Sequence, residues 1–246
     1  MLDDRSERPR DRVFELRRYR LVPGQRETLI ELFDREFVET QEAVGMSVVG
    51  QFRDLDKPDH FVWFRGFPDM ERRKQALTGF YTGSVWAEHG PAANATMLDS
   101  KDVLLLKPAA GREAFAEAGV ERPAPGGGDD RAGPLWLVAI HHLLPATREV
   151  DAVALADAVG EAARALGARI AASLVSEHAP NTFLRLPVRE GETVVVTVLR
   201  PGGVSEPARL IAALQPSSAA LGRFAALVAR PPEISRLMPT ARSLLR

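Results

Sequence analysis

The chain has 246 residues, of which 45% are hydrophobic and 26% charged, so it is long enough for a folded core and unlike a disordered or fibrous chain. Its 32 basic and 33 acidic residues nearly cancel, which removes the attraction that nucleic acids and anionic membranes exert on basic proteins. The absence of cysteine excludes disulfides, thiolate nucleophiles and cysteine-ligated metals. Residues 1–12 have no apolar export core, and no apolar run approaches the ~18 residues of a membrane span. We therefore expect a cytoplasmic protein whose partners include neither nucleic acid nor membrane.

Hydrophobic periodicity predicts six elements in the first half of the chain. A helix is indicated by Leu29, Leu32, Phe33 and Phe37, which recur at helical spacing. In chain order we expect a strand over 13–20, a helix over 25–43, strands over 46–54 and 60–66, helical segments over 69–98 and a strand over 103–107. This order is that of a ferredoxin-like βαββαβ unit.

A segment rich in proline and glycine, 123–134, is typical of a linker. After it the same order of elements returns: strands over 135–143, 169–176, 193–200 and 233–238, with helices over 150–166 and within 207–228. We therefore predict a first domain over 12–108, a linker over 109–133, a second domain over 134–239 and a tail over 240–246.

Weak internal matches support a duplication. Residues 16–23 align with 138–145 at one constant shift, Trp63-Phe64-Arg65 with Val198-Leu199-Arg200, and 102–108 with 233–239. The predicted strands are apolar on both faces, so each sheet needs a cover on the face that its helices leave bare. The two sheets supply that cover for one another. The predicted fold class is α+β, with two tandem ferredoxin-like domains forming one pseudo-dimeric α/β barrel.

Several motifs resemble a known family. They are Glu15-Leu16-Arg17-Arg18-Tyr19 followed by Pro23-Gly24, then Trp86-Ala87-Glu88-His89, Ala93-Asn94-Ala95-Thr96-Met97 and Leu104-Leu105-Leu106-Lys107-Pro108. This pattern resembles the NIPSNAP family of the dimeric α/β-barrel superfamily, and the second half resembles a diverged partner domain of actinobacterial members. The resemblance implies a barrel pocket. Relatives with this fold include cofactor-free monooxygenases, heme-handling enzymes, polyketide cyclases and proteins with no demonstrated activity.

The first strand carries the first candidate site residues. Glu15, Arg17 and Tyr19 share one of its faces, and we expect them to point into the barrel while the apolar residues of the other face meet the helices. The internal match places His141 opposite Tyr19, and Trp63 and Arg65 become neighbours on the third strand. The alternative is that Glu15 and Arg17 form an ion pair at the rim and that His141 is a core histidine.

A second group lies on the predicted helical segments. Trp86 and His89 share a helix face, with Tyr81 nearby. His89 precedes Gly90-Pro91, which predicts a helix break and places His89 at the next helix N-terminus, where the dipole favours a neutral base. Alanines stand at the positions equivalent to His89 and Asn94 in the second half, so any catalytic site is single. The alternative is that His89 caps a helix and Trp86 fills the core.

Other patterns give no site. The adjacent His141 and His142 point to opposite faces of a strand and are excluded as a metal pair, and no phosphate-binding glycine motif occurs. We therefore expect neither a metal nor a cofactor. Arg72-Arg73-Lys74 indicates a solvated helix face. The long loop over 177–192, which carries Phe183, either caps a barrel mouth or braces the two halves.

Two functional hypotheses follow, and the sequence leaves open whether the protein is an enzyme. In the first, the barrel encloses an apolar or aromatic small molecule of specialised metabolism and acts on it by acid/base, cyclase, isomerase or monooxygenase-like chemistry. The catalytic residues would be His89, Arg65 and Tyr19, and the binding residues Trp86, Trp63, Arg17, Glu15, Tyr81, Asn94, His141 and Phe183. In the second, the protein is a non-catalytic scaffold or binding module that forms a homo-oligomer. An interior filled by Trp63, Trp136 and their neighbours would leave no room for a substrate.

Overall fold

The computed structural model describes residues 10–116, 121–127, 133–202 and 206–246. Residues 1–9 of the N-terminal segment, and Gly128 with the two aspartates of the predicted linker, lie outside these residues. None of the described helices is both long and apolar enough to cross a membrane.

The first half contains the predicted elements in the predicted order. They are β1 (Val13–Leu21), α1 (Arg26–Leu32), the π-helical turn η2 (Phe33–Phe37), α2 (Val38–Ala43), β2 (Ser47–Asp54), β3 (His60–Phe67), α3 (Met70–Tyr81), α4 (Ser84–Ala95), β4 (Met97–Pro108) and the short turn η3 (Ala109–Gly111). The last strand begins at Met97 rather than at Val103. The helical segments expected over 69–98 are the two helices α3 and α4, which end and begin around Gly83.

The second half repeats this order with a weaker second helix. Its elements are β5 (Trp136–Leu143), α5 (Glu149–Ala165), β6 (Arg169–Ser176), β7 (Thr193–Arg200), α6 (Pro207–Ala213), the 3₁₀ turn η4 (Gly222–Leu227) and β8 (Glu233–Pro239). The helix expected within 207–228 is split into α6 and η4. Pro216 lies between them and has no N–H for a helical hydrogen bond.

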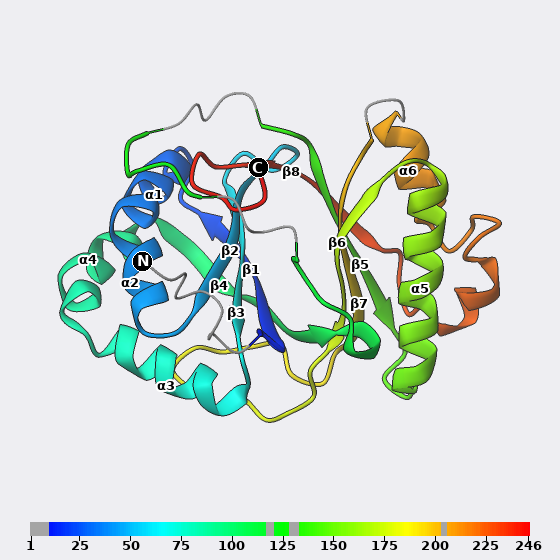
Figure 1. The fold of residues 1–246 in the computed structure, drawn as a ribbon, viewed down its shortest axis with the longest axis horizontal. Coiled ribbons are helices and arrows are strands. Elements are labelled where there is room, and N and C mark those ends of the chain that lie inside the picture. Colours follow the sequence, from blue (N-terminus) through cyan, green and yellow to red (C-terminus); the bar gives the residue numbers. More distant parts are fainter. Residues whose placement is uncertain (1–9, 117–120, 128–132, 203–205) are drawn as a thin grey trace, which may run out of the picture.

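The eight strands form one closed antiparallel barrel in the order β1-β3-β2-β8-β5-β7-β6-β4. Each half contributes four neighbouring strands, and the halves join edge to edge at β2–β8 and β4–β6. Closure pairs the edges that each four-stranded sheet would otherwise expose. Figure 1 shows α1 to α4 outside one side of the barrel and α5 and α6 outside the other. The predicted fold class is confirmed.

Strand registers reveal the duplication more clearly than the sequence does. A β-bulge interrupts β2 between Val48 and Gly50, and a second one interrupts β6 at the equivalent place, between Ile170 and Ala172. The register also corrects one alignment: Glu15 pairs with Arg65, whereas its counterpart Leu137 pairs with Leu199. Arg65 therefore corresponds to Leu199, one residue before the position expected from the sequence match.

The barrel lumen is a packed apolar core. Side chains from all eight strands meet there, and ring contacts join Phe14 to Phe115 at 5.3 Å and Phe52 to Trp136 at 6.4 Å between centroids. Trp63 lies outside this core, between the first sheet and its helices. The expectation of a ligand chamber in the lumen is therefore wrong, because the two sheets bury their apolar faces against each other.

The orientation expected for β1 is also wrong. Phe14 and Leu16 point into the lumen, whereas Tyr19 packs with the residues of α1, η2, α3 and α4. Glu15 and Arg17 share the face of Tyr19. A lumen walled by apolar strands offers no partner to a charged side chain, whereas the helices supply Arg73 and other polar groups.

Candidate functional site

A charged cluster is buried between the first sheet and helix α3. Glu15 is fully buried, and each of three guanidinium groups lies within hydrogen-bond distance of its carboxylate. Arg17 Nη1 lies 2.7 Å and Arg65 Nε 2.8 Å from Oε2, while Arg73 Nε lies 2.7 Å from Oε1. Two neighbouring strands and a helix therefore meet at one carboxylate, and we call Glu15, Arg17, Arg65 and Arg73 the arginine cluster.

The arginine cluster carries more positive than negative charge. Three guanidinium groups face one carboxylate, and among the described residues none of the three is ion-paired with a second acidic side chain. Aromatic rings disperse part of the excess: the Arg65 guanidinium lies 5.1 Å from the Trp63 ring centroid, and that of Arg17 lies 5.4 Å from Tyr19. The described residues therefore leave two buried positive charges without a counter-ion, which makes this layer attractive to an anion.

These contacts set the protonation states. Burial alone would raise the pKa of Glu15, but Arg65, Arg73 and Arg17 outweigh burial and hold that pKa well below its usual range. Burial lowers the pKa of Arg17, and the adjacent Tyr19 and Glu15 more than reverse this, so its pKa is raised. Burial raises the pKa of Tyr19 despite the opposing charge of Arg17. Glu15 is therefore ionised, and Tyr19 keeps its proton at neutral pH.

Polar atoms without partners lie in the same layer. Arg73 Nη2, Trp63 Nε1 and both side-chain amide atoms of Gln51 are buried and find no hydrogen-bond partner among the residues that the structure describes. Gln51 stands directly opposite Trp63 in the β2–β3 register, so the two side chains share a face. Buried polar groups are nearly always hydrogen-bonded, so these atoms require an explanation, and a bound water, ion or ligand would supply one.

The second half serves as an internal control. Leu137, Ala139 and Leu199 occupy the positions that correspond to Glu15, Arg17 and Arg65. There the layer between sheet and helices is mostly apolar: alanines of α5 pack on the strands, and the buried polar residues His141 and Thr197 are neutral members of that layer rather than a cluster of guanidinium groups. The same fold therefore forms without an arginine cluster, and the cluster is not a requirement of the architecture.

An aromatic group adjoins the arginine cluster. The rings of Tyr81 and Trp86 lie 4.6 Å apart, and Phe183 lies 5.8 Å from Tyr81. The negative charge that the Tyr81 hydroxyl can carry contributes to the raised pKa of Arg17, so Tyr81 is an electrostatic neighbour of the cluster. The structure thus brings together seven of the predicted site residues in or beside one layer: Glu15, Arg17, Tyr19, Trp63, Arg65, Tyr81 and Trp86, with Phe183 at its margin.

Three residues of the site were not anticipated. Arg73, expected on a solvated helix face, is fully buried, and its Nη1 donates to Asn181 Oδ1 at 3.0 Å and to Thr182 Oγ1 at 3.3 Å. A signal was available for Arg73, because it stands at helical spacing from Ala76, Leu77 and Phe80 on the inner face of α3. No comparable pattern marks Asn181 or Thr182, which lie in a loop.

His89 does not lie at a helix terminus, so the predicted break is wrong. Helix α4 continues through Pro91, and Gly90 packs against the indole of Trp86 so closely that a Cβ there would lie 2.7 Å from the ring. The imidazole Nε2 of His89 lies 3.5 Å from a carboxylate oxygen of Glu36. The reason for expecting a neutral base at His89 is therefore removed.

Two other predicted residues lie apart from the cluster. Asn94 is exposed beside a surface groove of about 340 Å³. His141 is buried in the layer of the second half, where its Nε2 lies 2.8 Å from the carbonyl oxygen of Leu214. His142 points the other way, toward Glu233, in agreement with the exclusion of a metal pair. Among the described residues, no three histidine or acidic side chains are grouped to hold a metal ion.

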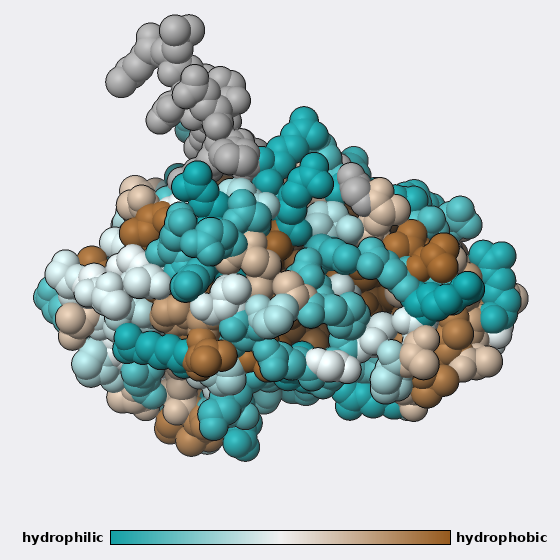
Figure 2. Space-filling view, turned by 90° about the horizontal axis from the view of Figure 1, so that it is seen from below, coloured by the Kyte–Doolittle hydropathy of each residue, from teal (hydrophilic) through white to brown (hydrophobic). Residues whose placement is uncertain are grey.

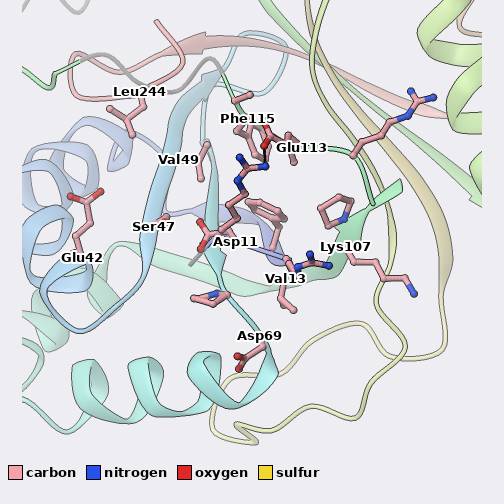
Figure 3. A pocket seen from close by; sticks show the side chains of 18 of the residues that line it. Asp11, Val13, Glu42, Ser47, Val49, Asp69, Lys107, Glu113, Phe115 and Leu244 are labelled. Atoms are coloured by element: carbon pink, nitrogen blue, oxygen red, sulfur yellow. Dashed lines mark ion pairs between the residues drawn. The ribbon is translucent and has the colours of Figure 1, made fainter. Parts of the chain in front are cut away.

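A wide groove lies at one end of the barrel, and none of the predicted site residues lines it. It has a volume of about 1690 Å³, and Figure 3 shows Val13, Val49 and Phe115 on its wall. Charged side chains that line this groove pair with one another; for example, Lys107 Nζ lies 2.9 Å from a carboxylate oxygen of Glu149. The face of the molecule seen in Figure 2 is mostly hydrophilic, with hydrophobic residues in separate groups.

Comparison with known proteins finds a family match for the first half and solved structures that share the fold of the whole chain. The NIPSNAP family model matches residues 14–111. A candidate monooxygenase from Fusobacterium nucleatum superposes with a TM-score of 0.55 at 7% identity, covering 94% of this chain and 93% of that one. A candidate monooxygenase from Lactobacillus acidophilus NCFM superposes with a TM-score of 0.51 at 12% identity, covering 93% of this chain and 94% of that one. An anthrone oxidase-like protein superposes with a TM-score of 0.51 at 14% identity, covering 94% of this chain and 92% of that one. Such identities show a shared fold. A search of curated proteins finds no match.

Proposed function

Because residues 14–111 match the NIPSNAP family model, we propose a function for the layer that the arginine cluster occupies. The protein binds a small aromatic molecule that carries an anionic oxygen, between the first sheet and its helices, and acts on it without a metal or nucleotide. The observation that carries this proposal is the burial of three guanidinium groups against a single carboxylate. Specialised metabolism is the setting that such substrates suggest.

The cluster has the properties of an oxyanion site. Arg17, Arg65 and Arg73 are held in place by Glu15, so little reorganisation is needed when a negative charge arrives. Their burial excludes water, which strengthens attraction to a charged ligand. Arg73 Nη2 and Trp63 Nε1, which have no acceptor among the described residues, would donate hydrogen bonds to such a ligand.

Tyr19 is the proposed proton donor. Its hydroxyl oxygen accepts a hydrogen bond from Arg17 Nε at 2.8 Å, while no described residue accepts its proton. Because the pKa of Tyr19 is raised, the proton stays available for a ligand oxygen. Tyr19 and the arginines together would stabilise an enolate-like or phenolate-like charge, an intermediate that cyclase, isomerase and monooxygenase-like reactions share. The proposal therefore gives the proton-handling role to Tyr19 rather than to His89.

The aromatic residues would form the walls of the site. Trp63 adjoins the arginine cluster, and Tyr81 and Trp86 continue the surface toward α4. An aromatic ligand fits such a lining, because ring contacts add specific stabilisation to burial. The two candidate monooxygenases and the anthrone oxidase-like protein share the fold, and only the description of the last names an aromatic compound.

Binding of benzoate and of its neutral counterpart benzamide tests the proposal. Isothermal titration calorimetry is expected to show benzoate binding to the wild type at least about tenfold more tightly than benzamide. Arg73→Gln should weaken benzoate binding by about tenfold or more, while Arg72→Gln, an exposed arginine one residue away, should leave it unchanged. Circular dichroism establishes that both variants are folded.

Equal affinity for the two probes, or no binding of either to the folded wild type, would contradict the proposal. The filled lumen would then favour the non-catalytic alternative. Light scattering would test that alternative, because a self-assembling module forms oligomers of defined mass.

A further inference from the structure

A loop of the second half reaches the arginine cluster of the first. Residues 177–192, between β6 and β7, leave the second sheet and are attached to β4 at both ends. The amide of Glu177 donates to the Leu105 carbonyl at 2.9 Å, and that of Arg189 to the Val103 carbonyl at 2.8 Å. We call this segment the crossing loop. It spans the join between the two halves.

The middle of the crossing loop covers the α3 side of the cluster. Thr182 Oγ1 donates to the Met70 carbonyl at 3.2 Å, and Arg185 Nη1 donates to the Tyr81 carbonyl at 3.0 Å. Phe183 packs beside Tyr81. These contacts bridge the two ends of α3, so the loop closes the layer that holds Arg73.

The crossing loop is more exposed than what it covers. None of residues 177–192 is fully buried; Phe183 and Leu186 are half-buried, and Leu184 is 85% exposed. The cluster beneath is at most 1% exposed, so a ligand reaches it only when some part of the cover moves. Segments with few buried apolar contacts open at a lower free energy than sheets and packed helices, and here that segment is the crossing loop.

The loop also supplies neutral acceptors to the cluster. Arg73 Nη1 is bound by the Asn181 amide oxygen and the Thr182 hydroxyl, while Nη2 has no partner among the described residues. A carboxylate accepts from both Nη atoms of an arginine in one plane and neutralises its charge, which neither an amide nor a hydroxyl does. A carboxylate would therefore satisfy Arg73 better than the loop does.

We propose that the crossing loop is the entrance to the arginine cluster and that Asn181 and Thr182 hold Arg73 until a carboxylate of the ligand replaces them. This inference rests on the proposed function and deepens it, because it names a carboxylate as the anionic group and assigns the closing segment to the other half. The second half, which has Leu137, Ala139 and Leu199 where the first has Glu15, Arg17 and Arg65, thereby controls access to the site of the first.

Two measurements with benzoate test the entrance. In the variant Asn181→Ala/Thr182→Ala the neutral acceptors are gone, so stopped-flow tryptophan fluorescence should show an association rate about fivefold or more above wild type, with tighter binding. Leu184→Ala, in the exposed part of the loop, should stay within about twofold. Hydrogen exchange in 177–192 should change when benzoate is added, while exchange in β1 and β3 stays slow.

The outcomes separate the two proposals. Failure of benzoate to bind the wild type would remove the proposed function. If benzoate binds but the double variant associates at the wild-type rate and loop exchange is unchanged, only the entrance is contradicted. Loss of binding in the folded double variant would also contradict it, because Asn181 and Thr182 would then hold the ligand. Binding of 4-cyanophenolate as tight as that of benzoate would contradict the preference for a carboxylate.

Discussion

Glu15→Gln is the substitution that most directly exposes the energetics of the arginine cluster. Glutamine has the size of glutamate, but it removes the negative charge and replaces one acceptor oxygen with an NH2 donor, so the three guanidinium groups at 2.7–2.8 Å lose their common counter-ion. Removing one partner of a buried ion pair costs about 3–5 kcal/mol, because the other charge stays buried and unpaired. With three cations affected, we expect the free energy of unfolding to fall by the upper part of that range, about 4–5 kcal/mol.

Urea denaturation at neutral pH measures this change, with Glu27→Gln as the matched control. Glu27 also binds an arginine, Arg53, but is half exposed, so its loss should cost about 1 kcal/mol or less. Bromide should then stabilise Glu15→Gln more than the wild type, because a bound anion restores the missing charge. A loss below about 1 kcal/mol for Glu15→Gln would refute the reasoning, since it would mean that the arginines are not confined by burial.

Three further outcomes are expected. Because the pKa of Glu15 is lowered in the folded state, its ionised carboxylate stabilises that state fully at pH values above the ordinary glutamate pKa of about 4.3. This stabilisation is lost as the pH falls toward the folded-state pKa of Glu15. Urea denaturation from neutral to acidic pH should therefore show that the free energy of unfolding falls more steeply for the wild type than for Glu15→Gln. Gly90→Ala should lower the free energy of unfolding by about 1–3 kcal/mol and displace Trp86, which thermal unfolding and tryptophan fluorescence measure. Gly79→Ala on α3 is the control: a Cβ there makes ordinary contacts, so this variant should not be less stable than the wild type. His89→Ala should leave benzoate affinity, measured by calorimetry, within about twofold; a larger loss would return His89 to the site.

The fold was predictable because its signals are local and repeated. Two-residue and helical periodicities located all eight strands and the long helices, and the equivalent bulges at Gly50 and Ala172 show that the repeat extends to backbone detail. The C-terminal helical region was less predictable, because α6 and η4 are short and interrupted.

The orientation of β1 illustrates what periodicity leaves undecided. Alternation shows that Glu15, Arg17 and Tyr19 share a face, but both faces of the strand are buried, so hydrophobicity does not identify the lumen side. In the structure the apolar residues Phe14 and Leu16 face the lumen. The polar face then lies against helices that carry compensating groups.

Arg73 shows why the composition of the site was only partly predictable. Its neighbours in sequence, Arg72 and Lys74, are exposed, and the carboxylate that it binds lies 58 residues earlier in the chain. Local charge density gives no hint of such a partner. The contacts of Arg73 with Asn181 and Thr182 span still more of the sequence and depend on how the two halves join.

Anomalous scattering from a crystal of the wild-type protein grown or soaked in bromide tests the central claim most directly. The account predicts a bromide peak within the first helix–sheet layer, in reach of Arg73 Nη2 or Trp63 Nε1, and none at the corresponding place in the second half, where the layer is mostly apolar. Bromide confined to surface arginines, with the three buried guanidinium groups fully satisfied by protein atoms, would contradict it.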